Sequence, residues 1–489
     1  MVNEEFQKYL EKTKEIGYVI HVSNPIVYLS GLPFAKVGEE IISEDGERGM
    51  IFGLDRMEAE VLMFEIEKIE AGKRVARTTE PFKIPLSDKL LGRIVNPLCK
   101  PLDRLGPILG KKEYLPVQRE APGIAKRERV NKQLETGVMV VDLLITLGYG
   151  QRTTIIGDAQ SGKTTFILQT MVNQAKKNTI CIYVGIGKES PALKSIESFL
   201  KEMKVFDKTI MIITTASQPP TLHYLAPFSG MTIAEYFRDK GHNVLIAFDD
   251  LSTHARAYRE TSLLLKRPPG REAYPGDIFH LHATLMERVG NIKLEEKKEV
   301  SITAFPIVET LENDISGFIQ TNVLAMTDGH IFFNLDEMKR GRLPPIDTFL
   351  SVSRVGNQTK KDLDKDLASK IKQKLSDYRK ALEVAQFGAE LSKETQKILD
   401  LGKRIEILFN QDYKTLIPRP LQLLLFGLLF SGFWKDVSYN TMEKEVKKIL
   451  KKFGEKDLSD LEAELDKMKK VEELKDFCEE IGPEIEKLL

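Results

Sequence analysis

Cysteine, net charge and long apolar runs are all scarce in this sequence. The 489 residues include three cysteines, Cys99, Cys181 and Cys478, which lie far apart and show no metal-binding spacing. Such a sparse, odd number disfavours a disulfide framework and indicates a reducing compartment. Lys+Arg and Asp+Glu each total 72, so the formal net charge is zero. Because proteins that bind nucleic acid usually carry a basic excess or stripe, we expect no nucleic-acid partner.

No segment predicts a secretory signal or a membrane span. The N-terminal sequence MVNEEF lacks the basic region and the apolar core of a signal peptide. The most apolar stretch, Leu421 to Trp434, has 14 residues and is too short to cross a bilayer, so we interpret it as a buried helix. These observations predict a soluble, cytoplasmic chain.

A phosphate-binding loop is the clearest motif that the sequence does contain. Residues 157–164 read GDAQSGKT and match the pattern G-x-x-x-x-G-K-[ST] at every position. The β-branched run 152–156 before it predicts a buried strand, and the apolar spacing in 165–174 predicts a helix. A strand-to-helix turn of this kind points backbone N–H groups and the helix N-terminus at a phosphate. The chain is therefore expected to bind a nucleoside phosphate such as ATP or ADP.

The residues of the loop have separate expected functions. Gly157 and Gly162 allow the turn, Lys163 would reach the β- and γ-phosphates, and the Thr164 hydroxyl would ligate Mg²⁺. Asp249 closes the apolar strand 244–248, so its carboxylate should emerge at the carboxyl edge of the sheet and hold the water shell of Mg²⁺. The predicted nucleotide-binding residues within the loop are Gly157, Asp158, Gln160, Ser161, Gly162, Lys163, Thr164 and Thr165.

The pattern of elements predicts a short helix followed by three domains. Residues 1–16 read as a charged helix with Asn3 as its N-cap, and residues 17–85 as the short strands of a small antiparallel β-barrel. Residues 86–362 alternate apolar strands with helices, which indicates an α/β domain with a parallel sheet. Residues 363–489 show only helical signals and predict an α-helical bundle. The expected strands of the sheet after the loop are 179–186, 209–214, 243–248, 300–308 and 322–333.

Several longer stretches carry a resemblance to a known family. They are GQR (150–152), CIYV (181–184), DDLS (249–252), KRPPGREAYPGD (266–277), PIVET (306–310) and SVSRVG (351–356). In these stretches and in its domain order, the chain resembles the headpiece subunits of rotary ATPases, and specifically the alpha subunits of F-type ATP synthases. The match runs in register from about Gly17 to at least Tyr413.

The resemblance implies a fold, an assembly and a location. The central domain is expected to be a RecA-like P-loop NTPase domain. Three alpha and three beta subunits would alternate around a central gamma shaft, with contacts to a peripheral stalk or delta subunit and, through the complex, to a membrane rotor sector. The chain would then lie at the cytoplasmic face of the cell membrane, in a complex that couples ATP synthesis or hydrolysis to ion (hydrogen ion) transport.

Two positions bear on which subunit does the chemistry. Hydrolysis needs a carboxylate that polarises the attacking water. In catalytic relatives that glutamate follows a Gly-x-Gly, whereas here Gly185-Ile-Gly187 is followed by Lys188, a departure from the Gln usual in alpha subunits. Glu189 stands one residue further on, where its side chain is aimed differently. We therefore interpret the chain's own site as non-catalytic.

Arg354 is the candidate catalytic residue of this chain. It ends the stretch Ser351-Val-Ser-Arg354, and the matching arginine of the family reaches across the subunit interface to the γ-phosphate held by beta. Such an arginine finger neutralises the charge that develops in the transition state.

The nucleotide-base region departs from the family pattern. Asn410 and Asp412 stand where two glutamines usually flank a glycine near the base, and they complete the predicted nucleotide-binding residues. Met338 and Leu343 replace the usual Phe and Arg, and Ala159 replaces an Arg of the loop. These changes predict weaker or altered selectivity for the base.

Three other functions remain open at this stage. A specialised F-like ATPase that only hydrolyses ATP would share all these motifs. A self-sufficient hexameric motor of the secretion type would need a catalytic carboxylate after Gly187. An RNA translocase would need basic and aromatic side chains on the barrel, but that region carries acidic runs such as Glu44-Asp-Gly-Glu47.

Overall fold

The computed structural model describes residues 3–65, 67–295, 298–386, 392–454 and 457–488. Residues 1–2 and 489, at the ends of the first and last predicted segments, lie outside these ranges. The chain packs into two compact units, each assembled from separate stretches. The first unit comprises Met1–Glu128, Asn178–Glu309 and Ile315–Thr327, and the second comprises Arg129–Lys177, Thr310–Asp314 and Asp328–Leu489.

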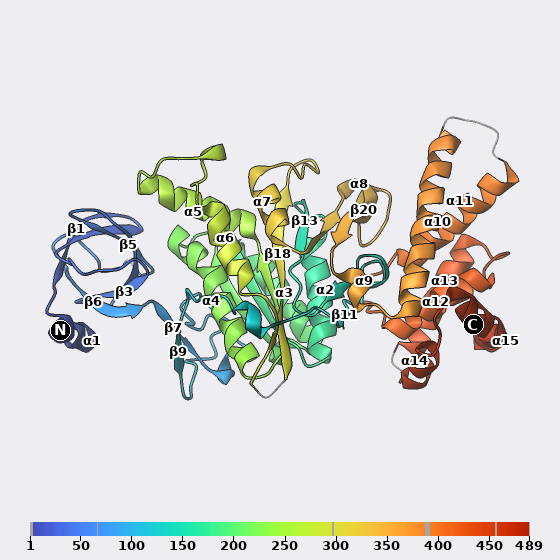
Figure 1. Ribbon diagram of the computed structural model, residues 1–489, viewed down its shortest axis with the longest axis horizontal. Helices are drawn as coiled ribbons and strands as arrows, with labels where there is room; N and C mark the ends of the chain where they lie inside the picture. Colours follow the sequence, from blue (N-terminus) through green and yellow to red (C-terminus); the bar gives the residue numbers. More distant parts are fainter. Residues whose placement is uncertain (1–2, 66, 296–297, 387–391, 455–456, 489) are drawn as a thin grey trace. The chain divides into compact units, whose positions relative to one another are not determined.

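A closed antiparallel barrel occupies the N-terminal part of the first unit, as predicted (Figure 1). The order of its strands is β1 (Gly17–Ser23), β2 (Ile26–Ser30), β5 (Ala59–Met63), β4 (Arg48–Leu54), β3 (Glu39–Ser43) and β6 (Arg74–Pro81). Buried apolar side chains, among them Val19, Ile41 and Val61, form one cluster, and closure pairs the strand edges that an open sheet would expose. Helix α1 (Glu4–Thr13) precedes the barrel, and the Asn3 side chain caps it by accepting from the N–H groups of Glu5 and Phe6. The predicted cap is thus confirmed.

A parallel sheet forms the second part of the first unit. Its strand order is β8 (Ile94–Val95), β15 (Thr209–Thr215), β14 (Ile180–Lys188), β16 (Val244–Asp249) and β18 (Glu299–Thr310). Strands β14, β15 and β16 are buried along almost their whole length, which explains their near-continuous apolar sequences. The four strands predicted at 179–186, 209–214, 243–248 and 300–308 are confirmed to within two residues at each end.

Shorter strands and five helices complete the first unit. Strand β17 (Gly290–Lys293) pairs antiparallel with β18 and with β10 (Arg127–Glu128), and β7 (Lys83–Leu86) pairs with β9 (Glu113–Pro116). The described helices of this part are α3 (Ser190–Glu202), α4 (Pro220–Asp239), α5 (Leu251–Leu264), α6 (Ile278–Glu287) and α7 (Phe318–Met326).

The strand predicted at 322–333 is wrong in its first half. Asn322 to Met326 belong to helix α7, and strand β19 (Gly329–Phe333) begins only after the turn at Thr327-Asp328. Ile319 and Val323, four residues apart, are the buried residues of α7, which is the spacing of a helix face. A short apolar run fits a buried strand and a buried helix equally well, and here the helix forms.

The second unit holds the phosphate loop between a strand and a helix. Strand β13 (Thr154–Asp158) leads into the loop, and α2 (Lys163–Lys176) follows it. Strand β13 pairs parallel with β19, and β19 pairs antiparallel with β20 (Ile346–Ser353). The small pair β11 (Gln133–Leu134) and β12 (Leu147–Gly148) and the helices α8 (Leu335–Lys339) and α9 (Gly356–Thr359) complete this part.

The remainder of the second unit is helical, as predicted (Figure 1). Its helices are α10 (Asp362–Gln386), α11 (Lys393–Phe409), α12 (Arg419–Ser431), α13 (Tyr439–Phe453), α14 (Ser459–Leu465) and α15 (Val471–Leu488). Helix α12 is buried from Arg419 to Leu429, which confirms the buried helix expected from its apolar sequence. Across the residues that the structure describes, no helix has the length and apolar character needed to cross a membrane.

Candidate nucleotide-binding site

The phosphate loop adopts the turn that its glycines predict. Gly157 has φ +156° and Gly162 has φ +94°. A Cβ atom on Gly157 would lie 2.8 Å from the Cβ of Phe333, so the loop can approach β19 only with glycine at this position. Helix α2 starts directly after Gly162, so its N-terminal N–H groups stand at the mouth of the loop.

Lys163 and Ser161 place polar groups inside the loop. The Lys163 Nζ donates to the carbonyl oxygens of Gly157, at 2.8 Å, and Asp158, at 2.5 Å. The Ser161 hydroxyl is fully buried and has no hydrogen-bond partner among the described residues. A buried hydroxyl without a partner costs stability unless a ligand satisfies it. The loop therefore offers an ammonium, an orphan hydroxyl and a helix N-terminus to an anion.

Asp158 forms hydrogen bonds within the second unit. Its carboxylate accepts from the hydroxyl of Thr310 and, at 3.0 Å, from the backbone N–H of Asn313. These bonds connect the loop to the segment Thr310–Asp314. The side chain of Asp158 therefore stabilises the conformation of the loop. Gln160 and Thr165 are exposed, and Gln160 has φ +60°. Thr164 is half-buried in the first turn of α2.

The two base-site positions, Asn410 and Asp412, follow helix α11 and differ in their contacts. Asn410 meets the segment after α8, because the N–H of Leu343 donates to its Oδ1 at 3.1 Å. A Cβ on Gly162 would lie 3.8 Å from the Cδ of Pro345, so this segment also borders the phosphate loop. Asp412 is exposed, and its carboxylate accepts from the N–H of Lys414. Asn410 also lines a cavity.

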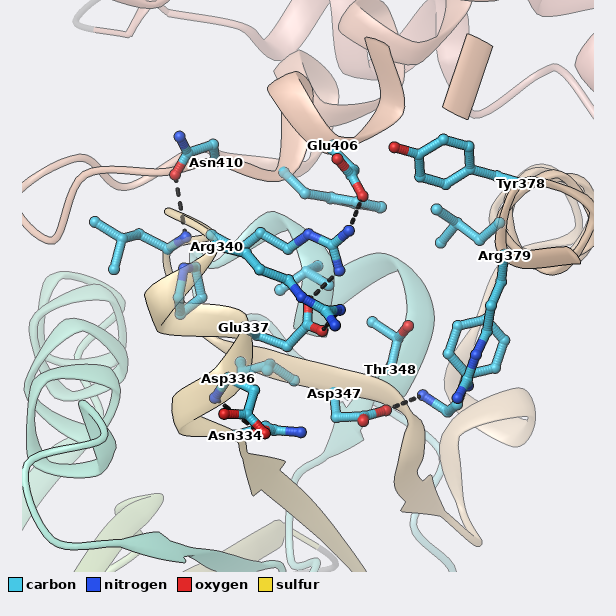
Figure 2. A pocket seen from close by; sticks show the side chains of 18 of the residues that line it. Asn334, Asp336, Glu337, Arg340, Asp347, Thr348, Tyr378, Arg379, Glu406 and Asn410 are labelled. Atoms are coloured by element: carbon cyan, nitrogen blue, oxygen red, sulfur yellow. Dashed lines mark hydrogen bonds and ion pairs between the residues drawn. The ribbon is translucent and has the colours of Figure 1, made fainter. Parts of the chain in front are cut away.

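That cavity measures about 290 Å³ and lies wholly within the second unit (Figure 2). Glu406 on α11 and Tyr378 on α10 line it opposite Arg340 and Glu337 of the α8 segment (Figure 2). The Arg342 guanidinium forms ion pairs with Glu337 and Glu406. Leu343 and Pro344 supply an apolar wall. The cavity thus combines an apolar surface with paired charges, which suits a planar polar group such as a base.

Arg354 follows directly on strand β20 and its side chain is exposed. Its backbone is anchored, because its N–H donates to the carbonyl of Asp328 at 3.0 Å, and Asp328 pairs with Arg152. Its guanidinium forms no hydrogen bond or ion pair with any residue that the structure describes. Arg354 thus presents an exposed guanidinium on a backbone that is fixed by a hydrogen bond.

Asp249, predicted to hold the metal's water, is already engaged within the first unit. The hydroxyl of Tyr183 donates to its Oδ2 at 2.6 Å, and the Lys188 ammonium lies 2.5 Å from its Oδ1. Lys188 also lies 3.5 Å from Asp250. Burial lowers the pKa of Lys188, but the carboxylates of Asp249 and Asp250 outweigh this and raise the pKa above its ordinary value. Burial, together with the negative charge of Asp249, raises the pKa of Tyr183 far above its usual range.

Two residues were predicted to hold a divalent metal. Thr164 offers a hydroxyl beside the loop, as metal binding requires. Asp249 contacts an ammonium and accepts from a phenol, and its predicted part in holding the metal's water stays a prediction. Thr164 belongs to the second unit and Asp249 to the first. Within the described ranges, no group of three or more His, Cys, Asp or Glu side chains could hold a metal ion.

The sequence pointed to Lys188 and Asp249 separately, but not to the contact between them, to the bond from Tyr183 to Asp249, or to the charges of the cavity. Tyr183 carried one signal, because a tyrosine inside an apolar strand needs a partner for its hydroxyl. Glu337, Arg342 and Glu406 carried none, since they resemble ordinary surface charges and Glu406 lies 64 residues beyond Arg342.

The comparisons with known proteins agree with one another. Residues 137–353 match the family model of the ATP synthase alpha/beta family, nucleotide-binding domain, and residues 358–481 match that of the ATP synthase alpha/beta chain, C terminal domain. A relative from Neorickettsia sennetsu, "ATP synthase subunit alpha", is 40% identical over 451 residues, which cover 90% of this chain and 88% of the relative.

Two further relatives carry the same name. The one from Acholeplasma laidlawii is 40% identical over 428 residues, covering 87% of this chain and 85% of the relative. The one from Salinibacter ruber is 36% identical over 499 residues, covering 96% of this chain and 90% of the relative.

Proposed function

Because the chain belongs to the ATP synthase alpha/beta family and is similar over most of its length to subunits named alpha, we propose that it is the nucleotide-holding, non-catalytic alpha subunit of an F-type or F-like rotary ATPase. It binds ATP or ADP at residues 157–164 without hydrolysing it. The catalytic sites belong mostly to a beta subunit that alternates with it in a ring.

The observation that carries the non-catalytic assignment is the contact set of Lys188. This residue follows Gly187, where a catalytic site needs a carboxylate to polarise water, and its ammonium is held by Asp249. A protonated amine cannot accept the proton of an attacking water. Glu189, the nearest carboxylate in sequence, is exposed at the start of α3. The first unit thus offers no general base at this position.

Nucleotide binding rests on the loop. Lys163 now donates to two neutral backbone carbonyls, and phosphate oxygens can replace these acceptors because their negative charge attracts the ammonium more strongly. The Ser161 hydroxyl and the first N–H groups of α2 add donors. Thr164 would ligate Mg²⁺, which supplies charge compensation for the phosphates. The base would lie against Leu343, Pro344 and Asn410, with the altered selectivity expected from these residues.

Arg354 completes the proposal as the residue that acts on a partner's nucleotide. Its exposed guanidinium follows a strand anchored through Asp328, so it can reach a γ-phosphate across a subunit interface. The remaining partners follow from the family: a gamma shaft, a peripheral stalk or delta subunit, and a membrane rotor sector. The chain would then be a peripheral part of a membrane-bound complex that couples ATP turnover to ion transport.

Binding without turnover can be tested on the isolated chain. We expect equilibrium dialysis with labelled ATP to show binding, and the bound ATP to remain intact over hours. Lys163→Ala should lose at least about tenfold in affinity, equivalent to about 1.4 kcal/mol, because the ammonium no longer meets the phosphates. Lys176→Ala, an exposed lysine at the end of the same helix, is the matched control and should bind normally.

The unfolding temperature without nucleotide distinguishes a binding defect from a folding defect in these variants. Equal affinity of Lys163→Ala and the unaltered chain would contradict binding at the loop. Conversion of bound ATP to ADP by the isolated chain would contradict the non-catalytic assignment.

A further inference from the structure

A cavity of about 700 Å³ lies in the first unit, beside the paired strands β7 and β9 (Figure 1). Its volume falls within the range of small-molecule sites, about 300–1,000 Å³. Its floor is apolar and belongs to the hydrophobic core of the unit or packs against it: Phe82, Ile84, Leu98, Cys99 and Ile108. None of the described residues that line this cavity belongs to the proposed nucleotide site.

The rim of the cavity is basic. Five cationic side chains line it: Arg48, Lys83, Lys100, Arg104 and Lys112. Glu65 is the one acidic residue of the described lining, and it pairs with Lys100. Lys83 pairs with Glu80, and Arg48 pairs with Glu5 and Glu40. The side chains of Arg104 and Lys112 form no hydrogen bond or ion pair with any residue that the structure describes, so two positive charges at the rim are uncompensated.

The backbone of Arg104 is fixed in an unfavourable conformation. Arg104 has φ +60°, in the left-handed region that residues other than glycine rarely adopt. Asp103 fixes the turn, because its carboxylate accepts from the Ile94 N–H at 3.1 Å and from the Arg93 guanidinium at 2.6 and 2.9 Å. Arg93 also donates to the carbonyl of Gly106 at 2.7 Å. Residues in such strained but firmly bonded conformations cluster at ligand-binding sites.

Lys112 and Ser87 bring a charge and a hydroxyl to the same cavity. Burial raises the pKa of the Cys99 thiol to about 12, and the charge of Lys112 partly opposes this, so the ammonium is near enough to act on the floor. The neutral thiol serves as an apolar surface. Ser87 is buried, and its hydroxyl accepts from the Lys89 N–H at 3.3 Å, but no described residue accepts from it. The hydroxyl is therefore available to donate to an anion.

We propose that this cavity binds an amphipathic anion, a carboxylate carried on an apolar chain or ring. The carboxylate pairs with Arg104 and Lys112 and accepts from the Ser87 hydroxyl, and the apolar part covers the floor. Because this is a second site, the proposal does not depend on nucleotide binding at the loop.

The ligand needs both parts. Exposed cations hold a small anion weakly, because water and salt screen the attraction. Burial of each CH₂ group against the floor strengthens binding about fourfold, equivalent to about 0.8 kcal/mol. A neutral apolar molecule would leave the two cations uncompensated, and an apolar cation would be repelled by them. An acidic peptide would pair with the rim but would leave the floor uncovered.

The test measures the binding of octanoate to the full chain by isothermal titration calorimetry. We expect saturable binding at one site per chain, and no saturable binding of acetate, inorganic phosphate or octylammonium at the same concentrations. Hexanoate, which is shorter by two CH₂ groups, should bind about tenfold more weakly. The affinity for octanoate should fall as the salt concentration rises.

A doubly substituted chain locates the site. Arg104→Gln combined with Lys112→Gln should weaken octanoate binding at least about tenfold, equivalent to about 1.4 kcal/mol. The matched control combines Arg56→Gln with Lys111→Gln, which removes the same charge from exposed residues of the first unit outside the cavity and should bind normally. Nucleotide affinity should be the same in all three proteins.

Equal octanoate affinity in the two doubly substituted chains would overturn the proposal while leaving the proposed function intact. A tetraglutamate peptide that binds as tightly as octanoate would also overturn it, because the occupant would then be an acidic protein segment. If the chain with Arg104→Gln and Lys112→Gln does not fold, the ligand series decides alone. Equal affinities for acetate, hexanoate and octanoate would then contradict the proposal, because the floor would contribute nothing.

Discussion

Lys163 and Lys188 place two ammonium groups in different chemical surroundings. Lys163 donates to the neutral carbonyls of Gly157 and Asp158. A phosphate that binds in the loop can therefore pair with this ammonium without breaking an existing ion pair. Lys188 is paired with the carboxylate of Asp249, so its charge is already compensated. At the residue scale, the first lysine is available to a ligand and the second stabilises the strand ends, which fits a site that holds nucleotide without hydrolysing it.

A second polar pair in the first unit predicts how stability depends on pH. The Nδ1 of His254 lies 2.9 Å from the Nε2 of His282, and the Nε2 of His254 donates to the Tyr224 carbonyl at 3.1 Å. Both rings are buried. Burial, with a smaller contribution from neighbouring histidines, lowers the pKa of His254 to about 4 and that of His282 well below its ordinary value of 6.5.

The folded chain therefore keeps both rings neutral where the unfolded chain protonates them. As the pH falls from 6.5 towards 4, only the unfolded state binds the protons, so the free energy of unfolding falls. Each histidine should contribute about 1.4 kcal/mol per pH unit in this window. We expect calorimetry to show this contribution as a pH-dependent difference between the unaltered chain and a variant of the pair, because Glu40 and Asp142, whose pKa values burial raises to about 7 and about 6, act in the opposite direction over the same window.

A matched pair of variants isolates this effect. His282→Gln removes one titrating ring and keeps a donor for His254, so between pH 6.5 and about 4 its free energy of unfolding should fall by about 1.4 kcal/mol per pH unit less than that of the unaltered chain. His280→Gln, on the exposed side of the same helix, should keep the full dependence. Identical pH profiles for all three proteins would show that the buried pair does not control acid stability.

At the scale of elements, helices α10 and α11 pack at a single glycine. Gly402 of α11 is buried, and a Cβ at this position would overlap the ring of Tyr378 on α10. Tyr378 is itself buried, so its ring would have to turn towards the cavity that it lines or push α10 away. Gly402→Ala should therefore lower the free energy of unfolding by about 1–3 kcal/mol, although alanine favours the helix itself.

Denaturant unfolding of this variant is compared with that of Lys397→Ala, an exposed position on the same helix. The control should change stability by no more than about 0.5 kcal/mol. A Gly402→Ala variant as stable as the unaltered chain would mean that α10 and α11 do not depend on this close approach.

Local patterns in the sequence predicted where helices and strands lie, but they predicted the contacts between these elements less well. Strands such as β14 and β16 could be predicted because both of their faces are buried, which makes their apolar runs continuous. The cap at Asn3 and the buried helix α12 were likewise readable from a few adjacent residues. Residues 322–326 were misassigned because a short apolar run carries no period that separates strand from helix.

Contacts between distant residues could not be read in the same way. Lys188 stood out as a departure from a pattern, but nothing in the sequence joined it to Asp249, which meets Lys188 and Tyr183 of β14 only when β14 and β16 pair. The pairing of Arg342 with Glu406 is of the same kind. The boundaries predicted at residues 16, 85 and 362 stay predictions, since the packing of the chain defines two units built from separate stretches.

At the scale of the whole molecule, an N-terminal barrel, a nucleotide-binding domain and a helical region belong to one chain. Relatives named ATP synthase subunit alpha match 87–96% of the chain, so the proposal concerns the full chain. On the proposed function, the chain contributes to turnover through Arg354 alone, and its own nucleotide stays unhydrolysed.

The measurement that tests this claim most directly is steady-state ATP hydrolysis by the chain alone and with a catalytic beta-type subunit. We predict no turnover by the chain alone, turnover by the mixture, and a loss of about a thousandfold or more when the mixture contains Arg354→Ala, as expected for an arginine finger. Arg56→Ala, an exposed arginine of the first unit, serves as the control and should leave the rate unchanged. Robust hydrolysis by the chain alone, or full activity of the mixture with Arg354→Ala, would contradict the account.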